Sequence, residues 1–121
     1  MNTKYEELDV YKLSENLSDK IWDIVIAWNN FEKDVLGKQL VKAADSISAN
    51  IAEGSGKGSF VDYKRYLKIS RGSLFETKQW LHKAFKRKLL DEADKETITK
   101  MIDELIPRLS AFINYMDTKS K

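Results

Sequence analysis

The most constraining feature of the sequence is a run of apolar and small residues, spaced three and four apart, between positions 60 and 84. The run lasts for about four heptads, and its members are Phe60, Tyr63, Leu67, Ser70, Leu74, Thr77, Leu81 and Ala84. This spacing places every member on one side of an α-helix. A repeat of this length indicates a long helix that packs against neighbouring helices along its whole length.

Three further segments show the same periodicity, and turn-forming residues are scarce between them. The chain of 121 residues has one Pro and five Gly, which favours a few long helices over many short strands. The predicted helices cover about residues 9–29, 33–54, 59–87 and 92–117. We therefore predict an all-α fold, an antiparallel up-down-up-down four-helix bundle that forms a single domain over residues 1–121.

The second half of the first predicted helix is more apolar than one packing stripe requires. Its apolar residues are Ile21, Trp22, Ile24, Val25, Ile26 and Trp28. At about 100° per residue they cover an arc of about 200°, roughly twice the stripe of an ordinary surface helix. Two interpretations stay open: the helix is buried between two neighbours in one bundle, or it forms a subunit interface.

A glycine lies in the middle of the third predicted helix, within Arg71-Gly72-Ser73. Glycine inside a helix costs about 1 kcal/mol relative to alanine. We expect this cost to be offset by close packing of Gly72 against small residues of the second helix, such as Ala44 and Ser48.

Polar residues border the apolar seam of the second helix. Ser46, Asn50 and Glu53 are spaced four and three apart, so they share a helix face. A half-buried Glu53 needs a cation, for which Arg71 is the first candidate and Lys57 the second. We predict a structural polar network of Ser46, Asn50, Glu53, Arg71 and Glu76. The alternatives are a binding or catalytic site built from Asn50, Glu53, Arg71 and Glu76, or residues that are merely solvated.

Positive charge is concentrated in one part of the chain. The net charge is +2, yet residues 57–90 carry ten Lys or Arg against two acids, a formal charge of +8. One stripe on the third helix, about 80° wide, holds Lys64, Lys68, Arg71, Phe75, Lys78, His82 and Lys86. Such a stripe suits the phosphates of RNA or DNA. The alternatives are a solvated face, an acidic protein partner or an anionic membrane surface.

Several functional classes find no support in the residues present. The chain has no Cys and a single His, so we expect no disulfide, no metal site and no cofactor. No nucleophile has a candidate base, so we predict that the protein is not an enzyme and has no catalytic residue. The polar first residues and the lack of an apolar run of about 20 residues predict a cytoplasmic protein that does not span a membrane.

Two motifs carry a resemblance to a known family. They are Ser46-Ile-Ser-Ala-Asn-Ile-Ala-Glu-Gly54 and Tyr66-Leu-Lys-Ile-Ser-Arg-Gly-Ser-Leu-Phe-Glu76, supported by Leu8-Asp-Val-Tyr11 and Lys42-Ala-Ala-Asp45. Together they resemble the four-helix-bundle proteins first noticed in intervening sequences of bacterial large-subunit ribosomal RNA genes. Where that family usually has Gln-Leu-Arg-Arg-Ala, this chain has Gln39-Leu-Val-Lys-Ala43, which removes positive charge from the second helix but not from the third.

The resemblance implies a left-handed bundle and ring-like homopentamers. The chain is also similar to the accessory proteins of diversity-generating retroelements, pentameric bundles that bind nucleic acid and a reverse transcriptase. We therefore predict a non-enzymatic homo-oligomer that binds RNA or DNA through the third helix. The alternative is an oligomeric protein–protein interaction scaffold, with a protein partner that the sequence does not identify and no nucleic-acid role.

Overall fold

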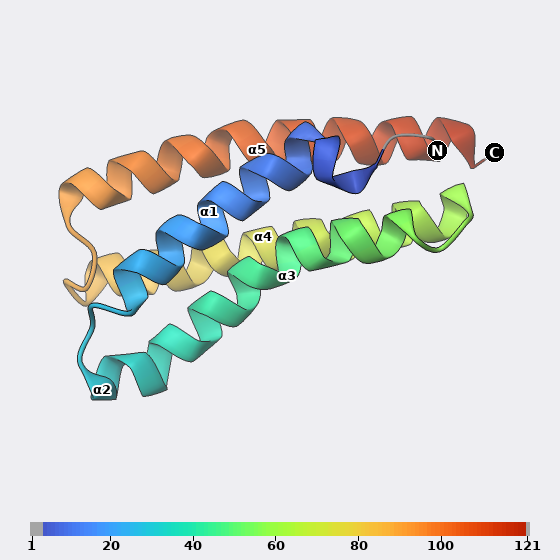
Figure 1. Cartoon of the computed structure of the whole chain (residues 1–121). Helices are drawn as coiled ribbons and strands as arrows, with labels where there is room; N and C mark the ends of the chain where they lie inside the picture. Colours follow the sequence, from blue (N-terminus) through green and yellow to red (C-terminus); the bar gives the residue numbers. More distant parts are fainter. Residues whose placement is uncertain (1–3, 121) are drawn as a thin grey trace.

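The periodic segments fold as the long helices of an all-α four-helix bundle, seen in a computed structural model that describes residues 4–120 (Figure 1). The elements in chain order are η1 (Tyr5–Glu7), α1 (Asp9–Val25), α2 (Asn30–Glu32), η2 (Lys33–Gly37), α3 (Lys38–Ser55), α4 (Phe60–Lys86) and α5 (Glu92–Lys119). Helix α1 packs on α3 and α5, and α4 packs on the same two helices from the other side. Short connections make consecutive long helices antiparallel, as predicted.

The helix starts follow from capping residues in the sequence. Ser59 Oγ accepts a hydrogen bond from the Asp62 amide at 3.1 Å and so caps α4. Asp91 Oδ1 accepts from the Asp94 amide at 2.7 Å at the start of α5. Such side chains satisfy amides that have no partner in the first helical turn. The observed starts therefore lie within a residue or two of the predicted ones for these two helices.

The long apolar run on α4 faces the core. Seven of its eight predicted members are buried, and Phe60 is partly buried. Ser70 lies in this seam because its hydroxyl donates to the Ile47 carbonyl of α3 at 2.7 Å, which pairs a buried polar group across two helices. Within residues 4–120, no helix combines the length and apolar character needed to cross a membrane.

Two helix boundaries differ from the predicted ones. Helix α1 ends at Val25 rather than near residue 29. The chain then turns, and the Trp28 indole N–H donates to the Leu89 carbonyl at 2.9 Å, which ties the α1–α2 connection to the α4–α5 connection. Asn29 begins the next helical segment by accepting from the Glu32 amide at 3.1 Å. The buried contact of Trp28 is thus made from a turn and not from a helix.

The segment before α3 contains a π-helical turn, η2, which the apolar periodicity did not indicate. It ends at Gly37, where a Cβ atom would lie 2.8 Å from Val25 Cγ1. The absence of a side chain at this position lets the start of α3 approach the end of α1. A glycine is needed here for space.

The expectation for Gly72 is wrong. Gly72 is exposed on α4, and no non-neighbouring atom of the described residues 4–120 lies within 4 Å of the position that its Cβ would take. The close approach between α3 and α4 occurs at Gly54 instead. A Cβ there would lie 2.8 Å from Tyr66 Cβ and 3.1 Å from Tyr63 Cδ1.

Candidate nucleic-acid interface

Helix α4 carries most of the predicted basic stripe on its exposed side. Because its seam is buried against the other helices, the opposite side faces solvent. The exposed members of the stripe are Lys68, Phe75, Lys78, His82 and Lys86. Phe75 is 50% exposed, so an aromatic ring lies among the charged side chains of this face.

Two members of the stripe have partners on α5. The Lys64 ammonium forms an ion pair with Asp117 at 2.9 Å, and the Lys64 side chain is only 24% exposed. Arg71 Nη1 lies 3.4 Å from Ser110 Oγ, and Arg71 is partly buried. Both residues therefore lie toward the α4–α5 contact and are less available to an external ligand than the other members.

The remaining lysines of the stripe have no carboxylate partner within residues 4–120. Among the described residues, no ion pair includes Lys68, Lys78 or Lys86. Their charge is balanced only by solvent counterions, and a bound phosphate would release these ions. The exposed, unpaired part of the stripe is the part of this face suited to a polyanion.

A cleft between α4 and α5 continues this surface. Its volume is about 360 Å³, and it is lined on the α4 side by Lys78, Leu81, His82, Phe85 and Lys86, and on the other side by Leu90, Lys95, Thr99, Ile102 and Asp103. The Lys95 ammonium lies 4.1 Å from the centre of the Phe85 ring, within the range of a cation–π contact. Sequence reasoning missed Lys95. The short α4–α5 connection was the one available signal, because it brings the start of α5 beside the end of α4.

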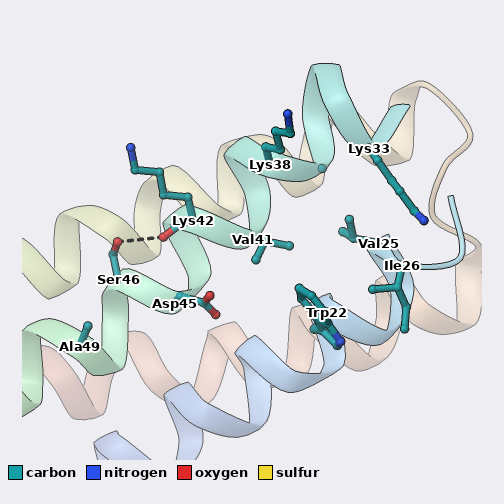
Figure 2. A pocket seen from close by; sticks show the side chains of 11 residues that line it. Trp22, Val25, Ile26, Lys33, Lys38, Val41, Lys42, Asp45, Ser46 and Ala49 are labelled. Atoms are coloured by element: carbon teal, nitrogen blue, oxygen red, sulfur yellow. Dashed lines mark hydrogen bonds between the residues drawn. The ribbon is translucent and has the colours of Figure 1, made fainter. Parts of the chain in front are cut away.

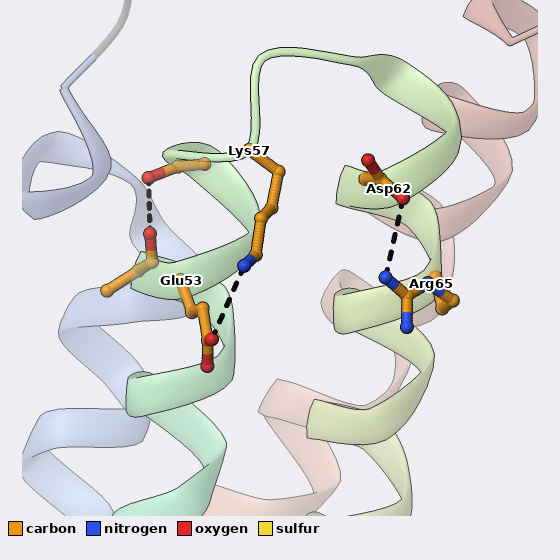
Figure 3. Close-up of polar contacts among 6 residues, drawn as sticks. Glu53, Lys57, Asp62 and Arg65 are labelled. Carbon is orange, nitrogen blue, oxygen red and sulfur yellow. Dashed lines mark hydrogen bonds and ion pairs between the residues drawn. The ribbon is translucent and has the colours of Figure 1, made fainter.

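The polar residues of α3 bond mainly within their own helix. The Ser46 hydroxyl donates to the Lys42 carbonyl at 2.8 Å, and the Asn50 amide donates to the Ser46 carbonyl at 2.7 Å. Glu53 pairs with Lys57 at 3.6 Å, and their side chains are 53% and 38% exposed (Figure 3). Each contact joins residues four apart in the sequence, which is the usual local alternative to bonds between helices.

The predicted network of five residues is therefore not a single network. Arg71 reaches Ser110 and not Glu53, and Glu76 accepts from the Trp80 indole N–H at 3.0 Å. Across residues 4–120, no hydrogen bond or ion pair joins Glu53 to Arg71. The reason is the exposure of Glu53, which removes the need for a buried cation.

A second exposed feature is an apolar groove between α1 and α3. Its volume is about 690 Å³, and its walls include Trp22 of α1, Ile26 directly after α1, and Val41 of α3 (Figure 2). Trp22 is 54% exposed and Ile26 is 48% exposed, while Ile21 and Val25 are buried. The bundle thus covers only part of the wide apolar arc predicted for the first helix, and burial between two neighbours in one bundle does not account for Trp22 and Ile26.

Comparison with known proteins agrees with this architecture. Residues 6–111 match the model of a family described as 23S rRNA-intervening sequence protein. No curated protein matches the chain. The fold is similar to the crystal structure of a protein with unknown function from the S23 ribosomal protein family from Bacteroides thetaiotaomicron, with a TM-score of 0.75 and 24% identity over 86% of this chain and 97% of that chain. Because the family model covers most of the sequence, the chain belongs to the 23S rRNA-intervening sequence protein family.

Proposed function

We propose that the protein binds RNA or DNA, without catalysing a reaction, through the exposed face of α4. The observation that carries this proposal is the row of unpaired cations Lys68, Lys78 and Lys86, with Phe75 exposed between the first two. Lysines without a carboxylate partner bind phosphates without first breaking an ion pair. An exposed aromatic ring among them offers a surface on which a base stacks.

The length of the row suits several phosphate contacts. From Lys68 to Lys86 the helix rises about 27 Å, at 1.5 Å per residue. Each phosphate contact contributes about −0.9 to the slope of log affinity against log salt on a duplex and about −0.7 on a single strand. Three lysine contacts therefore predict a slope of about −2 to −3, with further contributions from neighbouring cations.

Charge reversal along the row tests the proposal. The variant Lys68→Glu, Lys78→Glu, Lys86→Glu is expected to abolish binding of labelled RNA and DNA, measured by fluorescence anisotropy between about 50 and 200 mM salt. Lys64 is left unchanged because its ammonium is paired with Asp117. An unchanged affinity in this variant would contradict the assignment of this face.

A matched control separates the local effect from the change in net charge. Lys4, Lys12 and Lys100 are exposed lysines outside α4, and their reversal to Glu changes the net charge by the same amount. This control is expected to retain most of the affinity. Equal losses in both variants would mean that the protein binds through its overall charge, with no interface on α4.

A different surface supports self-association, the other part of the proposed function. Asp19, Trp22, Asp23 and Ile26 recur at the three- and four-residue spacing of one helix face, and all four are exposed, the first three on α1 and Ile26 at its C-cap. On α3, Lys38, Val41 and Lys42 form a similar exposed or partly exposed stripe on the groove wall. Lys38 also forms an exposed ion pair with Asp34 at 2.8 Å. The α1 stripe combines apolar and acidic side chains, and the α3 stripe combines apolar and basic side chains.

The occupant that fits the groove is a second copy of this chain. The acidic α1 stripe of one copy is complementary in charge to the basic α3 stripe of the next, and apolar residues meet between the charges. Contact between two different surfaces of the same chain is heterologous, and such contacts close into rings when the rotation permits. This agrees with the homopentamer implied by the family resemblance. Asp45, also on the groove wall, accepts from the Ser18 hydroxyl, so it is engaged within the chain.

A charge swap tests this contact. Asp19→Lys with Asp23→Lys is expected to dissociate the oligomer in sedimentation velocity, because it places like charges opposite each other. Adding Lys38→Asp and Lys42→Asp to the same chain restores opposite charges and is expected to restore the oligomer. A monomeric wild-type protein, or a swap that has no effect, would contradict the contact.

The two functions respond differently to salt. Phosphate binding weakens steeply as salt rises, whereas an interface with an apolar centre persists. An oligomer that binds neither RNA nor DNA at low salt would leave the protein as an interaction scaffold.

A further inference from the structure

We propose that the cleft between α4 and α5 holds one unstacked nucleotide, and that the protein consequently prefers single-stranded nucleic acid to duplex. This inference rests on the proposed function, since it identifies which form of nucleic acid the α4 face accepts. It concerns a site at one end of the basic row, where the surface changes from a convex helix to a concavity.

The cleft has the volume and the apolar lining of a small-molecule site. Its volume of about 360 Å³ lies near the lower end of the range of about 300–1,000 Å³ for ligand pockets. Leu81, Leu90 and Ile102 form part of its lining, and all three belong to the core. The partly buried ring of Phe85, one face of which lies under the Lys95 ammonium, adds an aromatic wall. Such a floor suits the flat, weakly polar face of a nucleobase.

The rim carries positive charge from two helices. Its cations are Lys78 and Lys86 of α4 and Lys95 of α5, and the His82 side chain of α4 also lines the cleft. No ion pair within the described part of the chain includes any of these four residues. The cation–π contact with Phe85 holds the Lys95 ammonium at the aromatic wall. A base on the floor would therefore have its phosphates among cations on both sides.

The α5 side of the cleft adds groups that can bond the edge of a base. The Thr99 hydroxyl can donate and accept, and the Asp103 carboxylate can accept from an exocyclic amine or a ring N–H. In a duplex these base edges are paired and the faces are stacked, so no base can enter. A duplex can use only the lysines, whereas a single strand can use the lysines and the cleft.

Blocking the cleft tests the inference. Thr99 is exposed on the cleft wall, so Thr99→Trp fills the space without changing a core residue. Thr97→Trp is the matched control, because Thr97 is an exposed threonine on the same helix outside the cleft. The probes are a labelled RNA strand of about 12 nucleotides, within the usual range of single-strand sites, and the same strand annealed to its complement.

The wild-type protein is expected to bind the single strand more tightly than the duplex. Loss of one stacked base weakens binding roughly 5- to 150-fold, the equivalent of about 1–3 kcal/mol. Thr99→Trp should cause a loss of this size for the single strand and leave duplex affinity unchanged, while Thr97→Trp changes neither. Should Thr99→Trp fail to fold, Thr99→Phe against Thr97→Phe gives the same comparison with a smaller ring, because only the threonine at 99 lines the cleft.

The outcomes distinguish this inference from the proposed function. If single strand and duplex bind equally and blocking the cleft changes nothing, while reversal of Lys68, Lys78 and Lys86 weakens both, the interface stands and the cleft proposal is overturned. If the wild-type protein binds neither form at low salt, the proposed nucleic-acid function fails and the cleft proposal fails with it.

Discussion

Replacement of Gly72 by alanine should stabilise the protein. Gly72 lies in the middle of α4, is exposed, and has no atom within 4 Å of the position of an added Cβ. Its backbone φ is not in the left-handed region, where the positive-φ glycine is Gly58. Alanine therefore fits without strain, and it restricts the unfolded chain more than glycine does.

The size of the effect follows from helix propensity alone. Alanine is favoured over glycine in a helix interior by about 0.8–1 kcal/mol, and no packing term opposes this gain at Gly72. For a domain of this length, a gain of about 1 kcal/mol raises the melting temperature by about 3–6 °C. Urea denaturation followed by circular dichroism at several protein concentrations measures the free energy of unfolding and separates it from oligomerisation.

Gly54→Ala is the matched comparison, because it offers the same propensity gain at a crowded position. The added Cβ would lie 2.8 Å from Tyr66 Cβ, and overpacking of this kind costs about 1–3 kcal/mol. We therefore expect Gly54→Ala to be neutral or destabilising. If Gly72→Ala instead destabilised the protein at every concentration, an added Cβ at position 72 would have to meet a neighbour in the folded protein. That result would refute the reasoning.

Three further outcomes are expected. Trp28→Phe should lower the free energy of unfolding by about 1–2 kcal/mol in urea titrations, because it leaves the Leu89 carbonyl without its donor. Glu53→Ala should change stability by less than about 0.5 kcal/mol in the same assay, because the ion pair with Lys57 is exposed. Burial raises the pKa of Tyr63 from 10.0 to about 12. The unfolded state therefore loses its proton first, and stability falls as the pH rises from about 10 to 12; Tyr63→Phe should make this fall shallower in an alkaline unfolding titration.

The sequence was sufficient to predict the helices and their buried sides. The spacing of Leu67, Leu74 and Leu81 selects one face of α4, and burial of that face needs no knowledge of its neighbours. The role of each glycine was not predictable in this way. Gly54 and Gly72 are both helical glycines, and only the relative position of α3 and α4 decides which of them meets a neighbour.

The candidate interface was predicted in outline and corrected in detail. Periodicity places the lysines of α4 on one side, yet it cannot tell which of them has a partner. Lys64 and Asp117 are far apart in the sequence, and their ion pair exists because α4 and α5 are antiparallel neighbours. The polar residues of α3 were assigned to a network between helices because their spacing fits one, but local bonds to carbonyls one turn back satisfy Ser46 and Asn50 first.

The π-helical turn η2 has a consequence for changes in chain length. A π turn closes hydrogen bonds one residue further along than an α turn, so it holds one residue more. Removal of an exposed residue from it, Asp34 or Val35, would leave an ordinary α-helical turn and preserve the register of α3. A single-residue deletion within α3 or α4 would instead rotate the remaining buried side by about 100°. Natural relatives that are one residue shorter are therefore expected to have lost that residue in the segment Lys33–Gly37.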